Sequence, residues 1–205
     1  MSETRRLSIF PLPGAILFPG LQLPLHIFEP RYRELVGSAL AKDRLIGMVQ
    51  PQRSGEGSPL YAIGCLGQIG EVEAMEDGRY NIVLEGRQRF RILRELDATT
   101  AFRQVEAELI DEPMDEALAS VERAGFEFEA KRFAAMQGYQ VDWDSVERLD
   151  DETLINGVAQ IAPFDSAAKQ ALLEAETLSQ RCELMIQLMQ FFALRDDGDE
   201  IVTLQ

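Results

Sequence analysis

The sequence is poor in the residues that most catalytic and metal-binding sites need. It contains one histidine, two cysteines and three lysines among 205 residues. A histidine-based zinc site or a Ser-His-acid triad would have His26 as its single centre, and Cys65 and Cys182 lack the spacing of metal ligands. We therefore expect no enzyme activity, no metal and no cofactor.

Long apolar runs are also missing. No stretch approaches the roughly 20 apolar residues that cross a bilayer. The first residues, MSETRR, precede a proline-rich segment rather than an apolar core with a small-residue cleavage site, so we expect no signal peptide. Cys65 and Cys182 lie far apart in regions of different expected structure, which favours two reduced core residues over a disulfide. These features predict a cytoplasmic protein without membrane contact.

Basic residues are scarce in the second half. Residues 1–110 carry 13 Lys and Arg against 14 Asp and Glu, whereas residues 111–205 carry 7 against 21, and the chain has a formal net charge of −15. The change marks a boundary near Ile110, so we expect two lobes, residues 1–110 and residues 111–205. Because a surface of this sign repels a phosphate backbone, nucleic acid is not an expected partner.

Prolines and glycines punctuate residues 7–30 and exclude one long helix. A short strand is expected to end at Pro11, and residues 15–18 predict a second extended run. Residues 21–28 alternate between apolar and other residues, as a half-buried strand does. Pro30 suits the first position of a helix, with Glu29 beside its positive end. One apolar helix face then follows, made of Tyr32, Leu35, Val36, Ala39 and Leu40.

The remainder of the first lobe reads as short strands. They are expected at residues 44–50, 60–75, 80–84, 90–94 and 105–109, with an Asp-Gly hairpin at residues 76–79. Glycines at positions 64, 67 and 70 suggest bulges or a sharply bent wall. The pattern predicts a small, curled antiparallel sheet.

The second lobe reads as helices. Residues 115–137 form one helical stretch that Gly138 ends, and Asp165 can cap a short helix that runs to residue 172. Leu154, Val158 and Ile161 are spaced as one apolar face. Steps of four and three residues then predict the seam of a packed helix pair, made of Leu178, Cys182, Met185, Met189 and Phe192.

Several segments together resemble a known family. They read FPL at 10–12, LFPG at 17–20, LPLHIFEPRY at 23–32, YAIGC at 61–65, GQI at 67–69 and VLEGRQRFRI at 83–92, with a looser match in KQALLE at 169–174. In this order they closely resemble the LON substrate-binding domain, the N-terminal domain of the ATP-dependent Lon proteases. The resemblance implies an α+β fold in which a β-rich, PUA-like pseudobarrel is followed by an α-helical bundle.

The signature residues are interpreted as structural. They are Phe10, Pro11, Leu12, Pro24, His26, Phe28, Glu29, Arg31, Tyr32, Gly86, Arg89 and Phe90. For His26 we expect a hydrogen bond that locks the turn from strand to helix.

By resemblance, the function is recognition of polypeptides, either unfolded or carrying a degradation signal, with a protease or chaperone ATPase as a candidate partner. Each lysine follows an alanine, so the Gly-Lys-Ser/Thr ending of a P-loop is missing. The Ser-Lys pair of Lon belongs to a separate domain. We therefore expect neither ATPase nor peptidase activity, although kinship with Lon invites a peptidase label.

The peptide-binding residues that the sequence suggests are Ile16, Leu17, Phe18, Pro19, Arg87 and Arg91. Such a site needs an apolar groove with polar edges, which we expect in a cleft between the two predicted lobes, bordered by the proline turns of residues 11–20. The opposite interpretation of Ile16, Leu17 and Phe18 is core packing of at least two of them.

Three arginines, Arg87, Arg89 and Arg91, alternate along one expected strand. Their alternation suggests a basic stripe for an acidic peptide, or for RNA bound by the PUA-like lobe. The favoured alternative ties Arg89 to an internal carboxylate such as Glu29. The acid pairs at 150–151 and 196–197 are interpreted as solvated helix ends and tail, and fraying is expected over residues 196–200.

Overall fold

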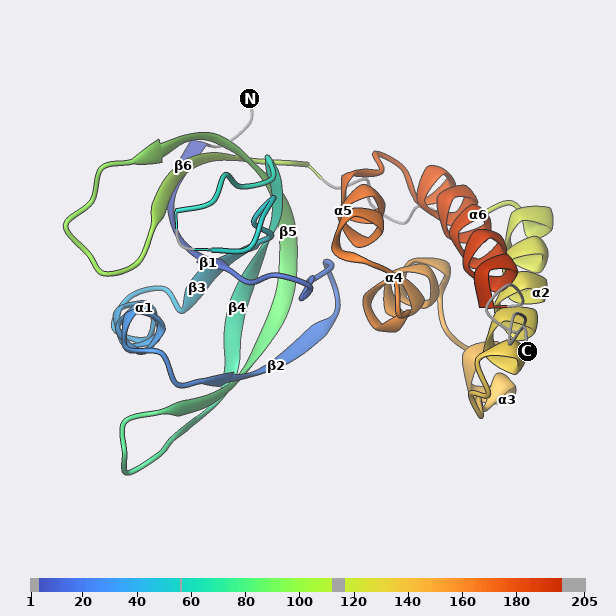
Figure 1. Cartoon of the computed structure of the whole chain (residues 1–205), viewed down its shortest axis with the longest axis horizontal. Coiled ribbons are helices and arrows are strands. Elements are labelled where there is room, and N and C mark those ends of the chain that lie inside the picture. The colour runs from blue at the N-terminus through green and yellow to red at the C-terminus, as the bar shows by residue number, and fades with distance from the viewer. Residues whose placement is uncertain (1–3, 56, 112–116, 197–205) are drawn as a thin grey trace, which may run out of the picture. The chain divides into compact units, whose positions relative to one another are not determined.

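The computed structural model of the chain describes residues 4–55, 57–111 and 117–196. Its architecture is α+β, with a six-stranded mixed sheet and six helices in the described part (Figure 1). The chain divides into two compact units, Met1–Glu112 with Asp165–Leu173, and Pro113–Phe164 with Glu174–Gln205. The segment Asp165–Leu173 therefore groups with the strands, whereas the sequence placed it in a helical lobe of residues 111–205.

The first unit contains all six described strands. They are β1 (Thr4–Pro11), β2 (Gln22–Ile27), β3 (Leu45–Val49), β4 (Ile63–Ala74), β5 (Tyr80–Leu96) and β6 (Gln104–Leu109). Their order is β2-β5-β4-β3-β1-β6, and a further pairing of β5 with β6 closes the sheet on itself. β1 and β3 are parallel, and the other neighbours are antiparallel.

β5 differs from the sequence prediction because it is one strand of 17 residues, not two short ones. Its first part pairs with β2 and its second part with β6, which requires a long, bent strand. The predicted bulges are confirmed, since the pairing of β4 with β5 shifts register at Leu66/Gly67 and at Ile69/Val72. The Asp-Gly hairpin is confirmed by the bond from Gly78 N to Met75 O, at 2.9 Å.

Gly86 permits a close approach of two backbone segments. A Cβ atom at this position would lie 1.9 Å from the carbonyl oxygen of Phe18. The Gly86 N–H donates to Leu21 O at 2.8 Å, and the Gly86 carbonyl accepts from Gly20 N at 3.0 Å. Residues 15–18 thus cross β5 without forming the predicted extended strand, and they are largely buried there.

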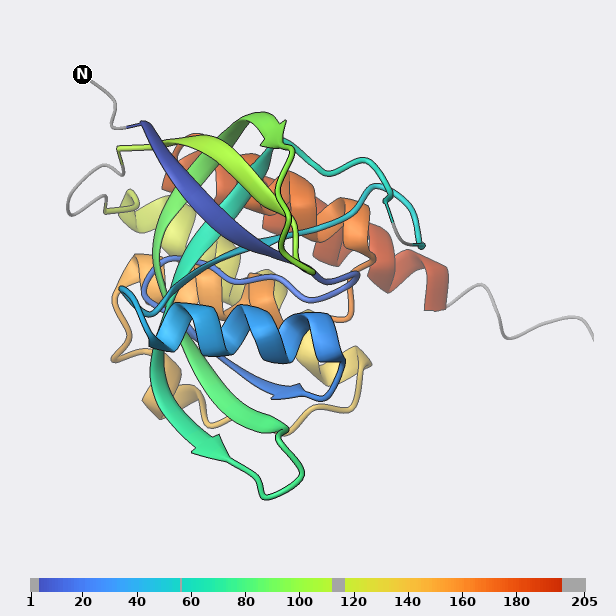
Figure 2. The ribbon, with the colours of Figure 1, turned by 90° about the vertical axis from the view of Figure 1, so that its left-hand side faces the viewer.

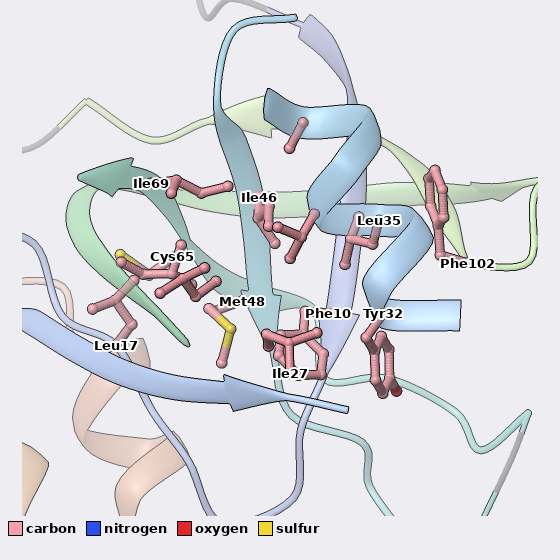
Figure 3. Packing of buried hydrophobic residues seen from close by; sticks show 14 residues of the cluster. Phe10, Leu17, Ile27, Tyr32, Leu35, Ile46, Met48, Cys65, Ile69 and Phe102 are labelled. Atoms are coloured by element: carbon pink, nitrogen blue, oxygen red, sulfur yellow. The ribbon is translucent and has the colours of Figure 1, made fainter. Parts of the chain in front are cut away.

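The helix α1 (Pro30–Leu40) begins at Pro30, as predicted, with Glu29 as its N-cap residue. Figure 2 shows α1 running across the strands of this unit. Tyr32, Leu35, Val36 and Ala39 are buried, which confirms the predicted apolar face. They pack against side chains of β1, β3 and β4 (Figure 3), including Phe10, Ile46, Met48, Cys65 and Ile69.

The helix α5 (Ser166–Glu174) is held to the strands by buried polar side chains. Asp165 Oδ1 accepts from Ala168 N at 2.8 Å, which confirms the predicted cap. Gln170 Nε2 donates to the Ile63 carbonyl at 3.0 Å, and Arg89 Nη1 donates to the Leu173 carbonyl at 2.9 Å. Because a buried polar group without a partner is costly, these bonds fix the docking of α5 on the sheet.

The second unit is helical. It consists of α2 (Ser120–Met136), α3 (Trp143–Val146), α4 (Asp151–Ile161) and α6 (Leu178–Asp196). Gly138, at φ +69°, follows the end of α2 as predicted. The predicted α6 seam is buried at Leu178, Cys182, Met185 and Met189. The start of the first predicted helix, at residues 115 and 116, and the tail at 197–200 lie outside the described residues.

The predicted apolar face of α4 is wrong in part. Leu154 is buried, but Ile161 is 80% exposed, and Ile155 and Ala159 are buried in its place. The face is rotated because Asn156 turns inward, where its Oδ1 accepts a hydrogen bond from Arg181 Nη1 at 2.7 Å. In the part of the chain that the structure describes, no helix is both long and apolar enough to span a membrane.

Candidate functional site

An apolar groove lies within the helical unit, between α2, α3 and α4. Its volume is about 770 Å³, and we call it the α2–α4 groove. Buried side chains of α2 and α4, among them Phe126, Phe133 and Leu154, form its floor. The size falls within the range of ligand pockets, which are mostly apolar with a few placed polar groups.

The rim of the groove exposes large apolar side chains. Tyr139, Val141, Leu149 and Ile161 all line it and are 37–80% exposed. Trp143, the only tryptophan in the sequence, also lines it and is half-buried. Because contiguous exposed apolar surface marks interaction sites more often than scattered residues do, this rim is the best candidate for binding in the helical unit.

Arg123 of α2 positions one wall of the groove. Its Nε lies 2.8 Å from Glu127 Oε1, and its Nη1 lies 2.6 Å from Asp151 Oδ1. Nη1 also donates to the Leu149 carbonyl at 2.9 Å, and Nη2 donates to the Glu147 carbonyl at 3.3 Å. The Asp151 carboxylate raises the pKa of Arg123. One side chain therefore joins α2 to the connection between α3 and α4.

Two aspartates cap the helices of the same wall. Asp142 Oδ1 accepts from Ser145 N at 3.3 Å, and Asp150 Oδ1 accepts from Thr153 N at 2.8 Å. The hydrogen bond from the Ser145 hydroxyl is the main cause that holds the pKa of Asp142 below its usual range. The hydrogen bond from the Thr153 backbone N–H is the main cause that lowers the pKa of Asp150. Both carboxylates are therefore ionised at neutral pH, and the acid pair at 150–151 is structural.

The structure places the sequence-predicted apolar ridge in the core. Ile16, Leu17, Phe18 and Pro19 are all buried, so they offer no surface to a peptide. The alternative interpretation of Ile16, Leu17 and Phe18, core packing, is the one that the structure bears out. The cause is the close approach of this segment to Gly86 on β5.

The three alternating arginines do not form a basic stripe. Arg87 falls at a register shift, where it has no paired residue on β4. Its side chain is exposed, and its Nη2 lies 2.9 Å from Glu85 Oε2. Arg91 is also exposed, whereas Arg89 is buried beside α5. The expected partner of Arg89, Glu29, lies instead 3.0 Å from Arg31 Nε, and Arg89 binds the Leu173 carbonyl.

The family-like signature residues divide into a buried set and an exposed set. Phe10, Tyr32, Gly86 and Phe90 are buried, and Pro11 and Leu12 are half-buried. Pro24 and His26 are exposed on β2, and Phe28, directly after this strand, is exposed as well. His26 does not lock the turn, because its Nδ1 lies 2.7 Å from Asn81 Oδ1 on the neighbouring strand.

The proline turn of residues 11–13 borders a different hollow. It has a volume of about 410 Å³ and is also lined by Arg31, Tyr32 and Arg103. Arg103 lies 2.6 Å from both carboxylate oxygens of Glu95, and its Nη1 donates to the Ser58 carbonyl at 2.9 Å. This hollow is smaller and more polar than the α2–α4 groove, so it suits apolar side chains less well.

The two thiols are poorly placed for chemistry. Cys65 and Cys182 are both buried, and neither forms a disulfide bond. Burial raises the pKa of Cys182 to about 11, so the reactive thiolate form is scarce at neutral pH. Among the described residues, no group of three or more His, Cys, Asp and Glu side chains is placed to hold a metal ion.

Comparison with known proteins places the chain among relatives of Lon. It is 31% identical over 180 residues to Lon protease 2 of Syntrophobacter fumaroxidans, which covers 82% of this chain and 22% of that protein. It is 24% identical over 198 residues to Lon protease of Escherichia coli strain K12, which covers 92% of this chain and 25% of that protein. The chain thus spans a quarter or less of these relatives' length.

Two solved structures share the fold. One is described as a Lon N-terminal domain protein from Xanthomonas campestris, with a TM-score of 0.68, 21% identity and coverage of 91% of this chain and 98% of that one. The other, the N-terminal domain of Mycobacterium avium complex Lon protease, has a TM-score of 0.67, 20% identity and coverage of 96% and 100%. The sequence model of the ATP-dependent protease La (LON) substrate-binding domain matches residues 6–190. The chain therefore belongs to the family of LON substrate-binding domains.

Proposed function

We propose that this chain recognises polypeptides without catalysing a reaction on them, and that the α2–α4 groove is where they bind. The observation that carries the proposal is the apolar groove of about 770 Å³ with exposed apolar side chains on its rim. Unfolded chains expose the apolar side chains that folded proteins bury. A groove of this kind therefore binds unfolded chains in preference to folded proteins, because it contacts the apolar side chains that only unfolded chains expose.

The polar residues on the groove support this specificity. Glu127 is held by Arg123, and the hydroxyl of Thr153 donates to Asp150 Oδ2 at 2.7 Å. Because these groups already have partners, a peptide can place apolar side chains against the groove without leaving them unpaired. The energy of binding then comes from the apolar area removed from water.

Strand addition is a less favourable mode of binding. β2 lies at the end of the strand order and pairs with β5, so its other side is a sheet edge. Pro24 sits in the middle of this strand and lacks a backbone donor. Proline on an edge strand is a known means of preventing further pairing. Side-chain recognition in the groove therefore fits the structure better.

The experiment is a fluorescence-anisotropy titration with a labelled, permanently unfolded polypeptide. We expect saturable binding that an unlabelled copy of the same polypeptide competes away and that a natively folded form of the same sequence does not. Binding that persists at moderate salt would agree with an apolar contact. Failure to bind at high micromolar concentration would refute the proposal, and affinity capture would then be used to seek one dedicated partner.

A further inference from the structure

We propose that the α2–α4 groove selects polypeptide segments whose apolar side chains are flanked by lysine or arginine, an inference that rests on the proposed function and names its substrate class. The evidence is the composition of one wall. Residues 141–152 contain six acidic residues and one basic residue, Arg148.

Apolar and acidic residues alternate along that wall. Val141, Trp143, Val146 and Leu149 line the groove. The acidic residues Asp142, Asp144 and Glu147 lie between them in the sequence, Asp150 follows directly after, and all four are exposed. A bound segment would therefore meet apolar surface in the groove and negative charge immediately beside it. Such complementarity favours partners of the opposite charge and rejects those of the same charge.

Lys131 of α2 shows that this wall accommodates a cation. Its Nζ lies 5.5 Å from the centre of the Trp143 ring and 3.8 Å from Glu147 Oε1. An aromatic face and a carboxylate are the two groups that most often bind an ammonium or guanidinium group in proteins. Asp144 and Asp150 extend the same acidic edge, so a lysine or arginine of a bound segment finds further carboxylates there.

The test compares three peptides that contain no tryptophan and share one apolar sequence. Their four flanking positions are lysine, glutamine or glutamate, and each peptide is titrated into the full chain at low and at moderate ionic strength. We expect the lysine peptide to bind about three- to tenfold tighter than the glutamine peptide, because exposed ion pairs contribute little each and are screened by salt. The glutamate peptide should bind most weakly.

A variant with two neutralised carboxylates distinguishes the effect of the charge on this wall from the effect of the net negative charge of the whole chain. Asp144→Asn with Glu147→Gln removes two carboxylates and leaves the helix caps Asp142 and Asp150 intact. This variant should lose most of the preference for lysine, measured as the ratio of the Kd of the glutamine peptide to the Kd of the lysine peptide. Glu183→Gln on α6, which contributes no residue to the groove, is the control and should keep the preference.

The outcomes distinguish the two proposals. Equal affinity for the three peptides, or a preference that survives in the double variant, overturns the charge selection and leaves polypeptide binding intact. Tighter binding of the glutamate peptide overturns it as well. If none of the three peptides binds, the proposed function itself fails.

Discussion

The substitution Ile161→Gln tests the groove without disturbing the fold. Ile161 is the last residue of α4 and is 80% exposed, so its side chain contributes little to folding. Glutamine has a helix propensity at least as favourable as that of isoleucine. The free energy of unfolding, measured in urea, should therefore change by no more than about 0.5 kcal/mol.

The same substitution should weaken peptide binding. Full burial of an isoleucine side chain contributes about 1.5–3 kcal/mol, and association retains only part of this. A loss of about 1–2 kcal/mol corresponds to a five- to thirtyfold higher Kd in the anisotropy titration.

Phe128→Gln is the matched control. Phe128 lies on α2, is 67% exposed and does not line the groove. The Phe128→Gln variant should bind unfolded polypeptide with the same Kd as the parent protein. If Ile161→Gln and Phe128→Gln weaken binding equally, or if neither does, the apolar rim of the groove is not the binding surface and the reasoning is refuted.

Three further predictions concern stability. Gly86→Ala should destabilise the protein by more than about 3 kcal/mol in urea unfolding, or prevent folding. Gly37 lies inside α1 with open space for a Cβ atom, so Gly37→Ala should stabilise the protein by about 0.5–1 kcal/mol. Similar effects of the two substitutions would contradict the close approach at β5. Arg89→Met should lower the free energy of unfolding by about 1–3 kcal/mol because the buried Leu173 carbonyl on α5 loses its donor. Limited proteolysis of this variant should then cleave within residues 165–174. Resistance to the protease equal to that of the parent protein would contradict the docking of α5 on the sheet. The pKa of Asp150 is lower in the folded than in the unfolded protein, so its carboxylate stabilises the folded state above about pH 4, and this contribution is lost as the pH falls through the folded pKa. Asp150→Asn should therefore lose less stability between pH 5 and pH 3 than the parent protein does. A pH profile of stability equal to that of the parent would contradict the cap.

Local periodicity predicted the elements that are determined locally. The alternation over residues 21–28 gave β2, and Pro30 with the spacing of Tyr32, Leu35 and Val36 gave α1. The four- and three-residue steps gave the seam of α6. In each case the buried face repeats with the period of the element, so a short window of sequence contains the information.

The errors arise where distant segments meet. The contact of Gly86 with residues 18–21 buries an apolar run that reads as an exposed ridge. Arg89 is tied to a carbonyl 84 residues away, and a backbone acceptor leaves no mark in the sequence. The sequence suggests Glu29 as the partner because charge is visible in a sequence, whereas the carbonyl group at the end of a helix is not.

The sequence patterns do not reveal the groove, for a related reason. Its wall comes from α2, α3 and α4, and no single window contains it. Ile161 fits the spacing of one apolar face on α4, yet its side chain lies on the rim of the groove. A signal was available in the apolar residues Tyr139, Val141 and Leu149, which stand in a short, strongly acidic stretch that has little capacity to bury them.

The most direct test of the central claim uses the intrinsic fluorescence of Trp143, the single tryptophan of the chain, which lines the α2–α4 groove. A polypeptide without tryptophan, titrated into the protein, should shift the Trp143 emission to shorter wavelength as the groove loses water. The shift should saturate with the same Kd as the anisotropy signal of the labelled polypeptide. Saturable anisotropy with an unchanged Trp143 emission would show that polypeptides bind elsewhere and would contradict the account.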